Sequence, residues 1–391
     1  MPIKDKNHEL SRIQSGVYEN NINESPNLIE QDGIADDILQ YEDSLDDMNT
    51  AEGHITKKQS EKLILLYNSF WDEKGWEVGL GKEPFKRLSC PVRNCKITDD
   101  KMLLSQSDAV VFHIQQLGKL PPVKNNHQKW VFFMLECPEW SKNYNYKSEL
   151  WNRKFDWTMT YRTDSDIRLH YGQVDMVTSP VQQEVKNYTS IIESKMGDVA
   201  WIVSNCDTAS RRDQYVKELQ RYISVDVYGK CGNLTCRKDW RGSDKACLEM
   251  INKKYKFYIA FENSFCTDYV TEKFFKILPL DVVPVVRGGA DYSRFAPEGS
   301  YIETSKFESP KDLASHLKYL IKNPDEYIKY LRIKERFKAT AYFGPGKLPS
   351  WCDLCQKLHE DTTTGKSYKH IEDWWSRNHC HKPNDLDFLV K

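Results

Sequence analysis

Short apolar runs bounded by turn residues recur along most of the sequence and restrict its fold more than any other feature. They include DAVVFHI at 108–114 and KWVFFML at 129–135, and later VAWIVSN at 199–205 and FYIAFE at 257–262. Runs of this length that are rich in β-branched and aromatic residues predict buried strands, and helical patterns between them indicate parallel sheets. The expected fold class is therefore α/β, with two Rossmann-like units in tandem.

Composition divides the sequence into four segments. Residues 1–60 are polar and acidic with few aromatics, which predicts a disordered stalk. The two Rossmann-like domains are expected at 61–195 and 196–345, because a second β-α-β series begins near residue 199. Residues 346–391 form a tail rich in aromatics and cysteines, so we expect this tail to dock on the folded domains.

The charge balance argues against two classes of partner. With 56 basic and 57 acidic residues the net charge is near zero, so nothing favours nucleic acid or an anionic membrane surface. No signal peptide and no stretch of about 18 consecutive apolar residues is found. We therefore expect no membrane span in this chain.

Eleven cysteines are more than an ordinary cytosolic protein carries. Zinc would need a repeated C-x-x-C pair, and only 352–355 has that spacing, without a matching pair. Disulfides in an oxidising compartment are the favoured interpretation, although spacing does not give their connectivity. Because the count is odd, at least one thiol is free or paired between chains. Glycosylation sequons at Asn187 and Asn233 agree with such a compartment.

Thr271, Glu272 and Lys273 lie where a helix over 271–279 is expected to follow a buried strand. The sequence lacks the glycine-rich G-x-G-x-x-G and P-loop motifs, so a phosphate site would have to be built differently. Free backbone N–H groups at the start of a helix, together with an ammonium, could bind a pyrophosphate. The alternative is an ordinary helix start with a threonine cap and surface charges.

A second candidate phosphate element follows the strand at 199–205. Ser204 and Asn205 end this strand, and Arg211 and Arg212 follow at the start of the next helix. Arginine there could bind phosphate oxygens through two hydrogen bonds, and the alternative is a solvated basic turn. Two such elements, each after a strand end of the same domain, support a phosphate site more strongly than either element does alone.

Glu136 directly follows the apolar run KWVFFML at 129–135, just before Cys137 and Pro138. A carboxylate at the mouth of a buried strand is partly desolvated, which suits a general base. The alternative is a strand-end acid that caps a nearby amide. His113, at the end of VVFH, is interpreted as a core or strand-end residue.

Several ordered blocks together resemble the α1,3-fucosyltransferases, a family of inverting glycosyltransferases with a GT-B-type fold. The blocks are FYIAFENSFCTDYVTEKFFK with VPVVRGG, LECP, TYRTDSDI, WIVSNC, SYIETSKF and WCDLC, and the resemblance runs from about residue 62 to 380. It implies an acceptor-side domain at 61–195, a GDP-fucose-binding domain at 196–345, and a tail docked on the first domain by disulfides.

The resemblance also implies roles for single residues. Glu136 matches the family's general base. The implied donor contacts, with Arg211 as a neighbouring candidate beside Arg212, are Ser204, Asn205, Arg211, Arg212, Asn263, Tyr269, Glu272 and Lys273. Cys90 and Cys95 would bond to Cys352 and Cys355.

An Asp-x-Asp triplet, Asp164-Ser165-Asp166, lies in the first domain and is interpreted as structural rather than as a metal site. The resemblance implies no obligatory cofactor, with Mn²⁺ or Mg²⁺ in a stimulatory role. It also implies the Golgi lumen, since family members are type II Golgi proteins, although the usual membrane anchor is not found in this sequence.

The cysteine-rich loop YGKCGNLTCRKDW, Cys137, Cys266 and the block EDWW resemble most closely the core α1,3-fucosyltransferases of plants and invertebrates. The expected reaction is transfer of L-fucose from GDP-β-L-fucose to the innermost GlcNAc of N-glycans on a glycoprotein. The alternatives are the distal chitobiose GlcNAc, N-acetyllactosamine (the Lewis-type acceptor), or a catalytically silent glycan-binding relative.

Overall fold

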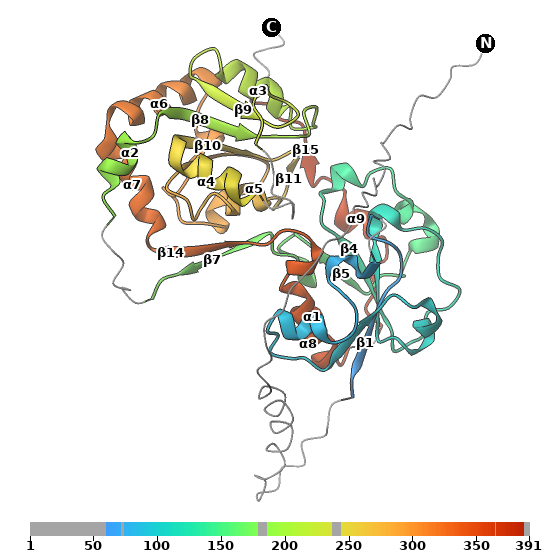
Figure 1. Ribbon diagram of the computed structural model, residues 1–391. Coiled ribbons are helices and arrows are strands. Elements are labelled where there is room, and N and C mark those ends of the chain that lie inside the picture. The colour runs from blue at the N-terminus through green and yellow to red at the C-terminus, as the bar shows by residue number, and fades with distance from the viewer. Residues whose placement is uncertain (1–59, 72–73, 179–185, 237–243, 364, 387–391) are drawn as a thin grey trace, which may run out of the picture. The chain divides into compact units, whose positions relative to one another are not determined.

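The computed structural model describes residues 60–71, 74–178, 186–236, 244–363 and 365–386. The stalk expected at 1–60 lies outside these residues except for its last position. The described chain is built around two parallel sheets with helices packed on them, which confirms the expected α/β class (Figure 1). The first sheet lies within 61–195 and the second within 196–345, while the boundaries of the domains stay a prediction.

The first sheet has six parallel strands in the order β2-β1-β3-β4-β5-β6. The apolar runs expected to form strands do so. Strand β2, which pairs with β1, is not predicted, because its four residues CKIT are too few and too mixed in polarity to give a strand signal. The strands are β1 Lys62–Leu66, β2 Cys95–Thr98, β3 Ala109–His113, β4 Lys129–Met134, β5 Trp157–Thr160 and β6 Ile167–Arg168.

Both faces of the first sheet are covered. On one face, helix α1 (Glu83–Arg87) and tail helix α8 (Ser350–Glu360) pack their apolar side chains against alternate strand residues. Figure 1 shows α1 and α8 side by side, although they lie far apart in the sequence. The other face is covered by short 3₁₀ segments and by tail helix α9 (Ile371–Trp375). The tail is therefore part of the core of this sheet.

The second sheet has five parallel strands in the order β13-β12-β10-β8-β9. Helices α2, α3, α6 and α7 pack on one face, and α4 and α5 on the other (Figure 1). The strands are β8 Gly197–Ile202, β9 Val225–Tyr228, β10 Tyr255–Phe261, β12 Val283–Arg287 and β13 Ile302–Glu303. The helices are α2 Tyr188–Glu193, α3 Arg212–Leu219, α4 Lys245–Lys254, α5 Glu272–Phe275, α6 Pro310–Lys322 and α7 Pro324–Lys334.

Central strand β10 shows why its sequence is apolar without alternation. Phe257 and Ile259 point into the cluster with α3, α6 and α7, whereas Tyr258 and Ala260 point into the cluster with α4 and α5. A strand covered on both faces needs apolar residues at every position. This is why the run FYIAF has no polar residue.

An antiparallel ribbon was not predicted. Strand β7 (Gly172–Met176) leaves the first sheet region and pairs with β14 (Phe337–Ala341), which follows the last helices of the second sheet region. Their sequences, GQVDM and FKATA, are mixed in polarity, so neither gives a clear strand signal.

The tail is held to both sheet regions. Cys90–Cys352 and Cys95–Cys355 attach α8 beside the first sheet, as the resemblance implies. Further along, β15 (Cys380–His381) pairs with β11 (Phe265–Cys266), and Cys266 is bonded to Cys380. The docking is therefore wider than expected, because it includes the second domain as well as the first.

The cysteines whose pairing the sequence left open are also placed. Cys206 bonds to Cys231, and Cys236 bonds to Cys247. Cys137 is the one cysteine without a bridge, and it is buried. It is therefore the odd thiol that the count requires.

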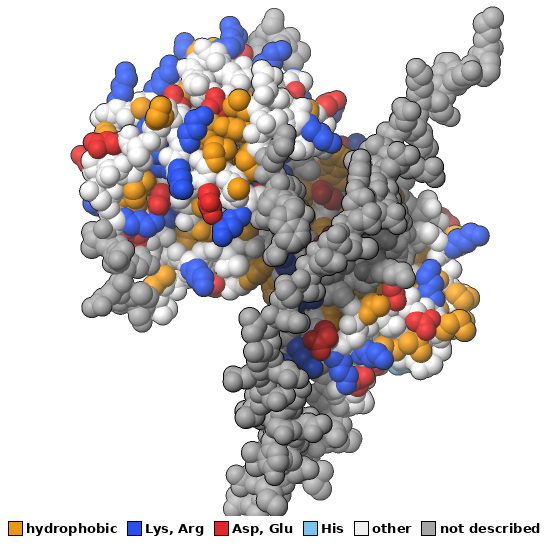
Figure 2. Space-filling view, viewed as in Figure 1, with side chains coloured by type: hydrophobic (Ala, Val, Ile, Leu, Met, Phe, Trp, Pro, Cys, Tyr) orange, Lys and Arg blue, Asp and Glu red, His pale blue; other side chains and the backbone are white. Residues whose placement is uncertain are grey.

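Figure 2 shows basic and acidic side chains interspersed over the visible face of the described residues, in keeping with the near-zero net charge. In the described part of the chain, no helix combines the length and the apolar character that a membrane crossing requires.

Loss of both bridges at α8 is expected to destabilise the fold by more than the sum of the two single losses. When one bridge is intact, the other closes only a short loop, made of residues 90–95 and 352–355. Closing a loop of this size stabilises the folded state by about 3 kcal/mol or less. Without either, the unfolded chain regains a loop whose ends are 260 or more residues apart, which adds about 5 kcal/mol. Urea unfolding measures this on three alanine variants: Cys90 with Cys352, Cys95 with Cys355, and all four. Simple additivity of the losses would contradict the prediction.

Candidate functional site

Glu136 and Tyr269 connect the two sheet regions. Glu136 lies two residues beyond β4, and Tyr269 lies in the loop between β11 and α5. The Tyr269 hydroxyl donates a 2.8 Å hydrogen bond to Oε2 of Glu136. The phenol ring is 1% exposed and packs edge-on against Tyr161 and Tyr171. The carboxylate of Glu136 is thereby held at the mouth of the first sheet by a fixed donor from the second region.

Glu262, directly after β10, organises the segment that was expected to bind phosphate. Its Oε1 accepts the backbone N–H of Thr271 at 2.8 Å and the Thr271 hydroxyl at 3.0 Å. The Thr271 amide is therefore not free for a ligand. Helix α5 covers only Glu272–Phe275, so the helix is shorter than the 271–279 expected, while phosphate binding by this segment stays a prediction. The remaining positive group of this segment is the ammonium of Lys273.

Lys273 lies between two carboxylates. Its Nζ is 3.3 Å from Oε2 of Glu262 and 3.3 Å from Oε1 of Glu272. Burial alone would lower the pKa of Lys273, but the charges of Glu262 and Glu272 outweigh it and raise that pKa above its ordinary value. For Glu272, burial opposes ionisation, yet the charge of Lys273 keeps the pKa below its usual range. The two carboxylates thus favour the charged form of Lys273, and the charges of Glu136 and Arg212 also act on it.

The structure separates the two arginine candidates. Arg211 has a left-handed backbone (φ 52°), and its guanidinium binds Oε1 of Gln214 at 2.9 and 2.7 Å near the surface. Arg212 is 4% exposed and donates to the carbonyl oxygens of Phe261 at 3.0 Å and Asn205 at 2.9 Å. Arg212 therefore lies at the ends of β8 and β10, and Arg211 points elsewhere.

Several buried polar atoms at these strand ends have no hydrogen-bond partner among the described residues, and two of them bear on ligand binding. They are Nε of Arg212, a donor, and Oδ1 of Asn263, an acceptor. Buried polar atoms are usually hydrogen-bonded, so an unpaired donor and acceptor beside Lys273 suit a ligand that supplies both. Ser204 and Asn205 are exposed in the same loop, and the Asn205 carbonyl already binds Arg212.

Gly289 follows β12 where the backbone passes close to β11. A Cβ at this position would lie 2.6 Å from the backbone nitrogen of Cys266 and 2.7 Å from the carbonyl carbon of Phe265. Only glycine permits this approach, which places the β11 segment of the site against the end of β12.

Asp164 and Asp166 lie in the turn between β5 and β6. Arg162 binds both oxygens of Asp164 at 2.9 and 2.5 Å. Asp166 accepts the backbone N–H of Thr158 at 2.9 Å and the ammonium of Lys366 at 2.9 Å. Both carboxylates hold this turn in place, in agreement with the structural interpretation of the triplet.

Burial makes two other titratable side chains, those of Cys137 and His113, poorly suited to proton transfer at neutral pH. Burial raises the pKa of the Cys137 thiol to about 12, and its sulfur lies within 4.8 Å of those of Cys266 and Cys380. His113 is 1% exposed in β3, and burial lowers its pKa to about 4. His113 is thus a core residue, as the sequence indicates, and Glu136 is the carboxylate left at the strand mouth.

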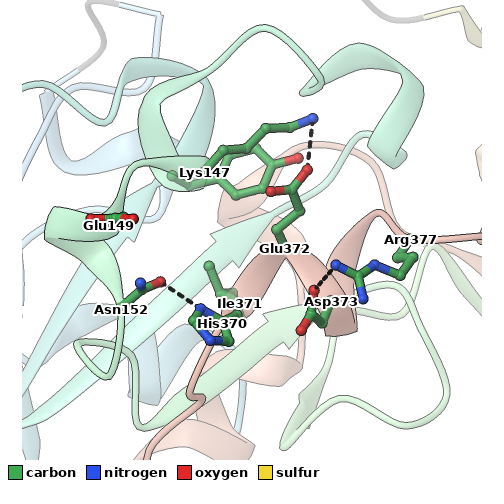
Figure 3. A pocket seen from close by; sticks show the side chains of 9 residues that line it. Lys147, Glu149, Asn152, His370, Ile371, Glu372, Asp373 and Arg377 are labelled. Atoms are coloured by element: carbon green, nitrogen blue, oxygen red, sulfur yellow. Dashed lines mark hydrogen bonds and ion pairs between the residues drawn. The ribbon is translucent and has the colours of Figure 1, made fainter.

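A cavity of about 390 Å³ adjoins the loops that carry Glu136 and Arg212. Another, of about 350 Å³, is lined by residues of the 145–152 segment and of the tail around α9 (Figure 3). In the latter, Lys147 faces Glu372 at 3.2 Å, and His370 lies 3.1 Å from Asn152. None of the residues lining the cavity in Figure 3 is a predicted site residue.

The two sequon asparagines are exposed. Asn187 caps α2 by accepting the backbone N–H of Ser190 through Oδ1 at 3.1 Å, and Asn233 lies in the loop after β9. Their glycosylation stays a prediction.

Three residues of the site were not assigned from the sequence. Glu262 directly follows the apolar run of β10, and a carboxylate at such a strand end is a signal that could have identified it. Ser210 binds the carbonyls of Asn263 and Glu262 through its N–H and hydroxyl. Tyr171 packs on Tyr269 and donates to the Leu135 carbonyl at 2.9 Å. The last two depend on contacts between distant segments, for which the sequence gives no signal.

Comparison with known families covers both sheet regions. Residues 192–374 match the family described as glycosyltransferase family 10 (fucosyltransferase), C-terminal part, and residues 59–172 match the fucosyltransferase N-terminal family. The chain belongs to glycosyltransferase family 10. This fucosyltransferase assignment confirms the resemblance found in the sequence, and it makes the protein an enzyme of fucose transfer.

Individual relatives agree with the family. The fucosyltransferase is 35% identical to α-(1,3)-fucosyltransferase C of Drosophila melanogaster, over 81% of this chain and 78% of the relative. It is 37% identical to glycoprotein 3-α-L-fucosyltransferase A of the same organism, over 80% of this chain but only 60% of the relative. A solved α1,3-fucosyltransferase with GDP aligns with a TM-score of 0.49 at 17% identity, covering 81% of this chain and 95% of the solved one.

Proposed function

We propose that this fucosyltransferase moves L-fucose from GDP-β-L-fucose, in α1,3 linkage and with inversion, to the innermost GlcNAc of N-glycans. The observation that carries the proposal is the hydrogen bond by which Tyr269 holds Glu136 at 2.8 Å, in a site where the charge of Glu136 also acts on Lys273. The glycoprotein acceptor is supported by the name of the 37% identical fly relative. The cysteine set, which resembles that of core enzymes, supports the innermost GlcNAc.

Glu136 acts as the general base. A sugar hydroxyl is too weak an acid to attack at neutral pH without a base, and inversion in one step needs no covalent carboxylate. The hydrogen bond from Tyr269 occupies one oxygen of Glu136 and fixes the direction of the other. That second oxygen is the atom that receives the proton of the acceptor hydroxyl.

Lys273 and Arg212 act on the leaving diphosphate. As the bond between fucose and phosphate breaks, negative charge grows on the β-phosphate, and fixed cations oppose it more strongly in the transition state. Glu262 and Glu272 raise the pKa of Lys273 and so favour its charged form, which is the form that opposes the growing negative charge. Asn263 and the unpaired Nε of Arg212 supply hydrogen-bonding groups for the donor.

No metal is obligatory in this mechanism, since Lys273 and Arg212 supply the positive charge that a divalent ion provides in other transferases. Transfer is expected to continue in excess EDTA at no less than about a tenth of the rate, with Mn²⁺ or Mg²⁺ in a stimulatory role. Rate measurements with and without EDTA test this. Complete loss that returns on adding Mn²⁺ would contradict it.

The Golgi lumen is the proposed location. Five disulfides stabilise the fold, and such bridges persist in oxidising compartments. The exposed sequon residues Asn187 and Asn233 are accessible to glycosylation there.

Incubation with GDP-fucose and two acceptors tests the function. One acceptor is a glycopeptide with an unmodified N-glycan core, and the other is free N-acetyllactosamine. We expect mass spectrometry to show one added fucose on the glycopeptide and none on N-acetyllactosamine. The reverse pattern would identify a Lewis-type enzyme. GDP-fucose that is neither transferred nor hydrolysed would identify a silent glycan-binding relative.

A further inference from the structure

The cavity of about 390 Å³ lies between two loops of the catalytic machinery. One wall is formed by residues from Glu139 to Tyr144, which follow Glu136 in the chain. The other wall is formed by Asp207, Thr208 and Ala209, which precede the arginine pair. The volume falls within the roughly 300–1,000 Å³ typical of small-molecule sites. The cavity therefore opens where a base and a donor-binding loop approach each other.

The first wall presents an aromatic ring on a fixed loop. Trp140 is 38% exposed and lines the cavity, whereas Cys137 and Pro138 just before it are buried. The backbone N–H of Trp140 donates a 3.0 Å hydrogen bond to the carbonyl oxygen of Cys137. The next residue, Ser141, accepts a 2.8 Å hydrogen bond from the buried indole of Trp375. The backbone that carries the ring is thus held in place before any ligand binds.

The second wall is tied to the donor site. The Ser210 N–H donates to the carbonyl of Asn263 at 3.0 Å, and the Ser210 hydroxyl donates to the carbonyl of Glu262 at 2.7 Å. The Arg211 N–H donates to the Thr208 carbonyl at 2.8 Å. A ligand against this wall is therefore positioned relative to the donor.

Polar side chains around the cavity remain available. Among the described residues, the side chains of Asn143 and Asp207 have no hydrogen-bond or ion-pair partner. Glu139 and Lys142 are paired with each other at 2.6 Å. An aromatic face flanked by an amide and a carboxylate suits a pyranose ring, whose C–H face is apolar and whose edge carries hydroxyls.

We propose that this cavity binds a sugar of the acceptor glycan, with its apolar face against Trp140 and its hydroxyls on Asp207 and Asn143. The proposal rests on the proposed function and names the residues that select its acceptor. A second hollow of about 270 Å³ shares Asn143 and Tyr144 with the first and continues toward 115–118. The two hollows therefore lie next to each other, and a glycan longer than one sugar can extend from the first toward the second.

Kinetics of Trp140→Ala test the proposal on the full-length enzyme. The acceptor KM should rise about tenfold or more, since a stacked aromatic is a typical binding hot spot. The affinity for GDP-fucose should stay within about twofold of wild type. Trp140→Phe should recover most of the acceptor affinity, and Asp207→Asn should raise the acceptor KM several-fold. Phe343→Ala, which removes an aromatic that is 64% exposed outside both hollows, should change neither constant.

An unchanged acceptor KM in Trp140→Ala would overturn the proposal. Loss of GDP affinity would also overturn it, because the cavity would then belong to the donor. If the wild type fucosylates no N-glycan, the proposed function fails, and calorimetry with a core N-glycan and GDP still tests the inference. Binding by the wild type that Trp140→Ala abolishes would support it, and equal binding or no binding would refute it.

Discussion

Replacing Glu136 by glutamine is expected to lower the rate of fucose transfer about 10²–10⁴-fold, the usual value of general-base catalysis. The amide keeps the size of the side chain and can still accept the hydrogen bond of Tyr269. It cannot take a proton from the acceptor hydroxyl. Binding of GDP-fucose should therefore survive while turnover is lost. Donor affinity and transfer rate are measured together on the purified variant.

The matched control for this change is Glu149→Gln. Glu149 is exposed in the cavity of Figure 3, and this cavity contains no predicted site residue, so its loss of charge should leave transfer unchanged. A near-normal rate for Glu136→Gln would exclude Glu136 as the base. Lost donor binding together with a lowered melting temperature would make Glu136 a structural residue.

Lys273→Ala is expected to reduce kcat/KM about 10²–10³-fold, because one charge that opposes the developing phosphate anion is removed. The affinity for GDP should fall, whereas that for guanosine, which lacks phosphate, should not. A purely structural role would change both affinities. Steady-state kinetics and calorimetry with the two ligands make this distinction.

Removal of Lys273 also leaves Glu262 and Glu272 without their shared cation, so the melting temperature must be measured in parallel. Lys276→Ala is the control for loss of a neighbouring charge, because the ion pair of Lys276 is with Asp244 at 3.1 Å and its charge acts on Glu272 only at longer range. Activity of Lys273→Ala within about twofold of wild type would show that the ammonium does not act on the leaving phosphate.

Much of the fold could be predicted because strands covered on both faces are apolar along their whole length. The runs FYIAF and VVF show this directly, because alternate residues of each run pack into the hydrophobic clusters on opposite faces of its sheet. The ribbon of β7 and β14 could not be predicted, because its residues are mixed in polarity and its partners are far apart in the sequence. The helix expected over 271–279 ends early, with a turn following Phe275.

The residues of the candidate site could be predicted where they lie just after the end of a strand. Glu136 and Arg212 lie after β4 and β8, as parallel-sheet topology implies. The choice between Arg211 and Arg212 needed the structure, since the left-handed backbone of Arg211 turns its side chain toward Gln214. The hydrogen bond between Tyr269 and Glu136 could also be found only from the structure, because the two residues come from different sheet regions.

The central claim is inverting transfer to one hydroxyl of the N-glycan core. Its most direct test is NMR of the product formed from GDP-β-L-fucose and a glycopeptide that carries an unmodified N-glycan core. We predict a single α-linked L-fucose on O3 of the innermost GlcNAc. A β-linked fucose, or fucose on another sugar or hydroxyl, would contradict the claim.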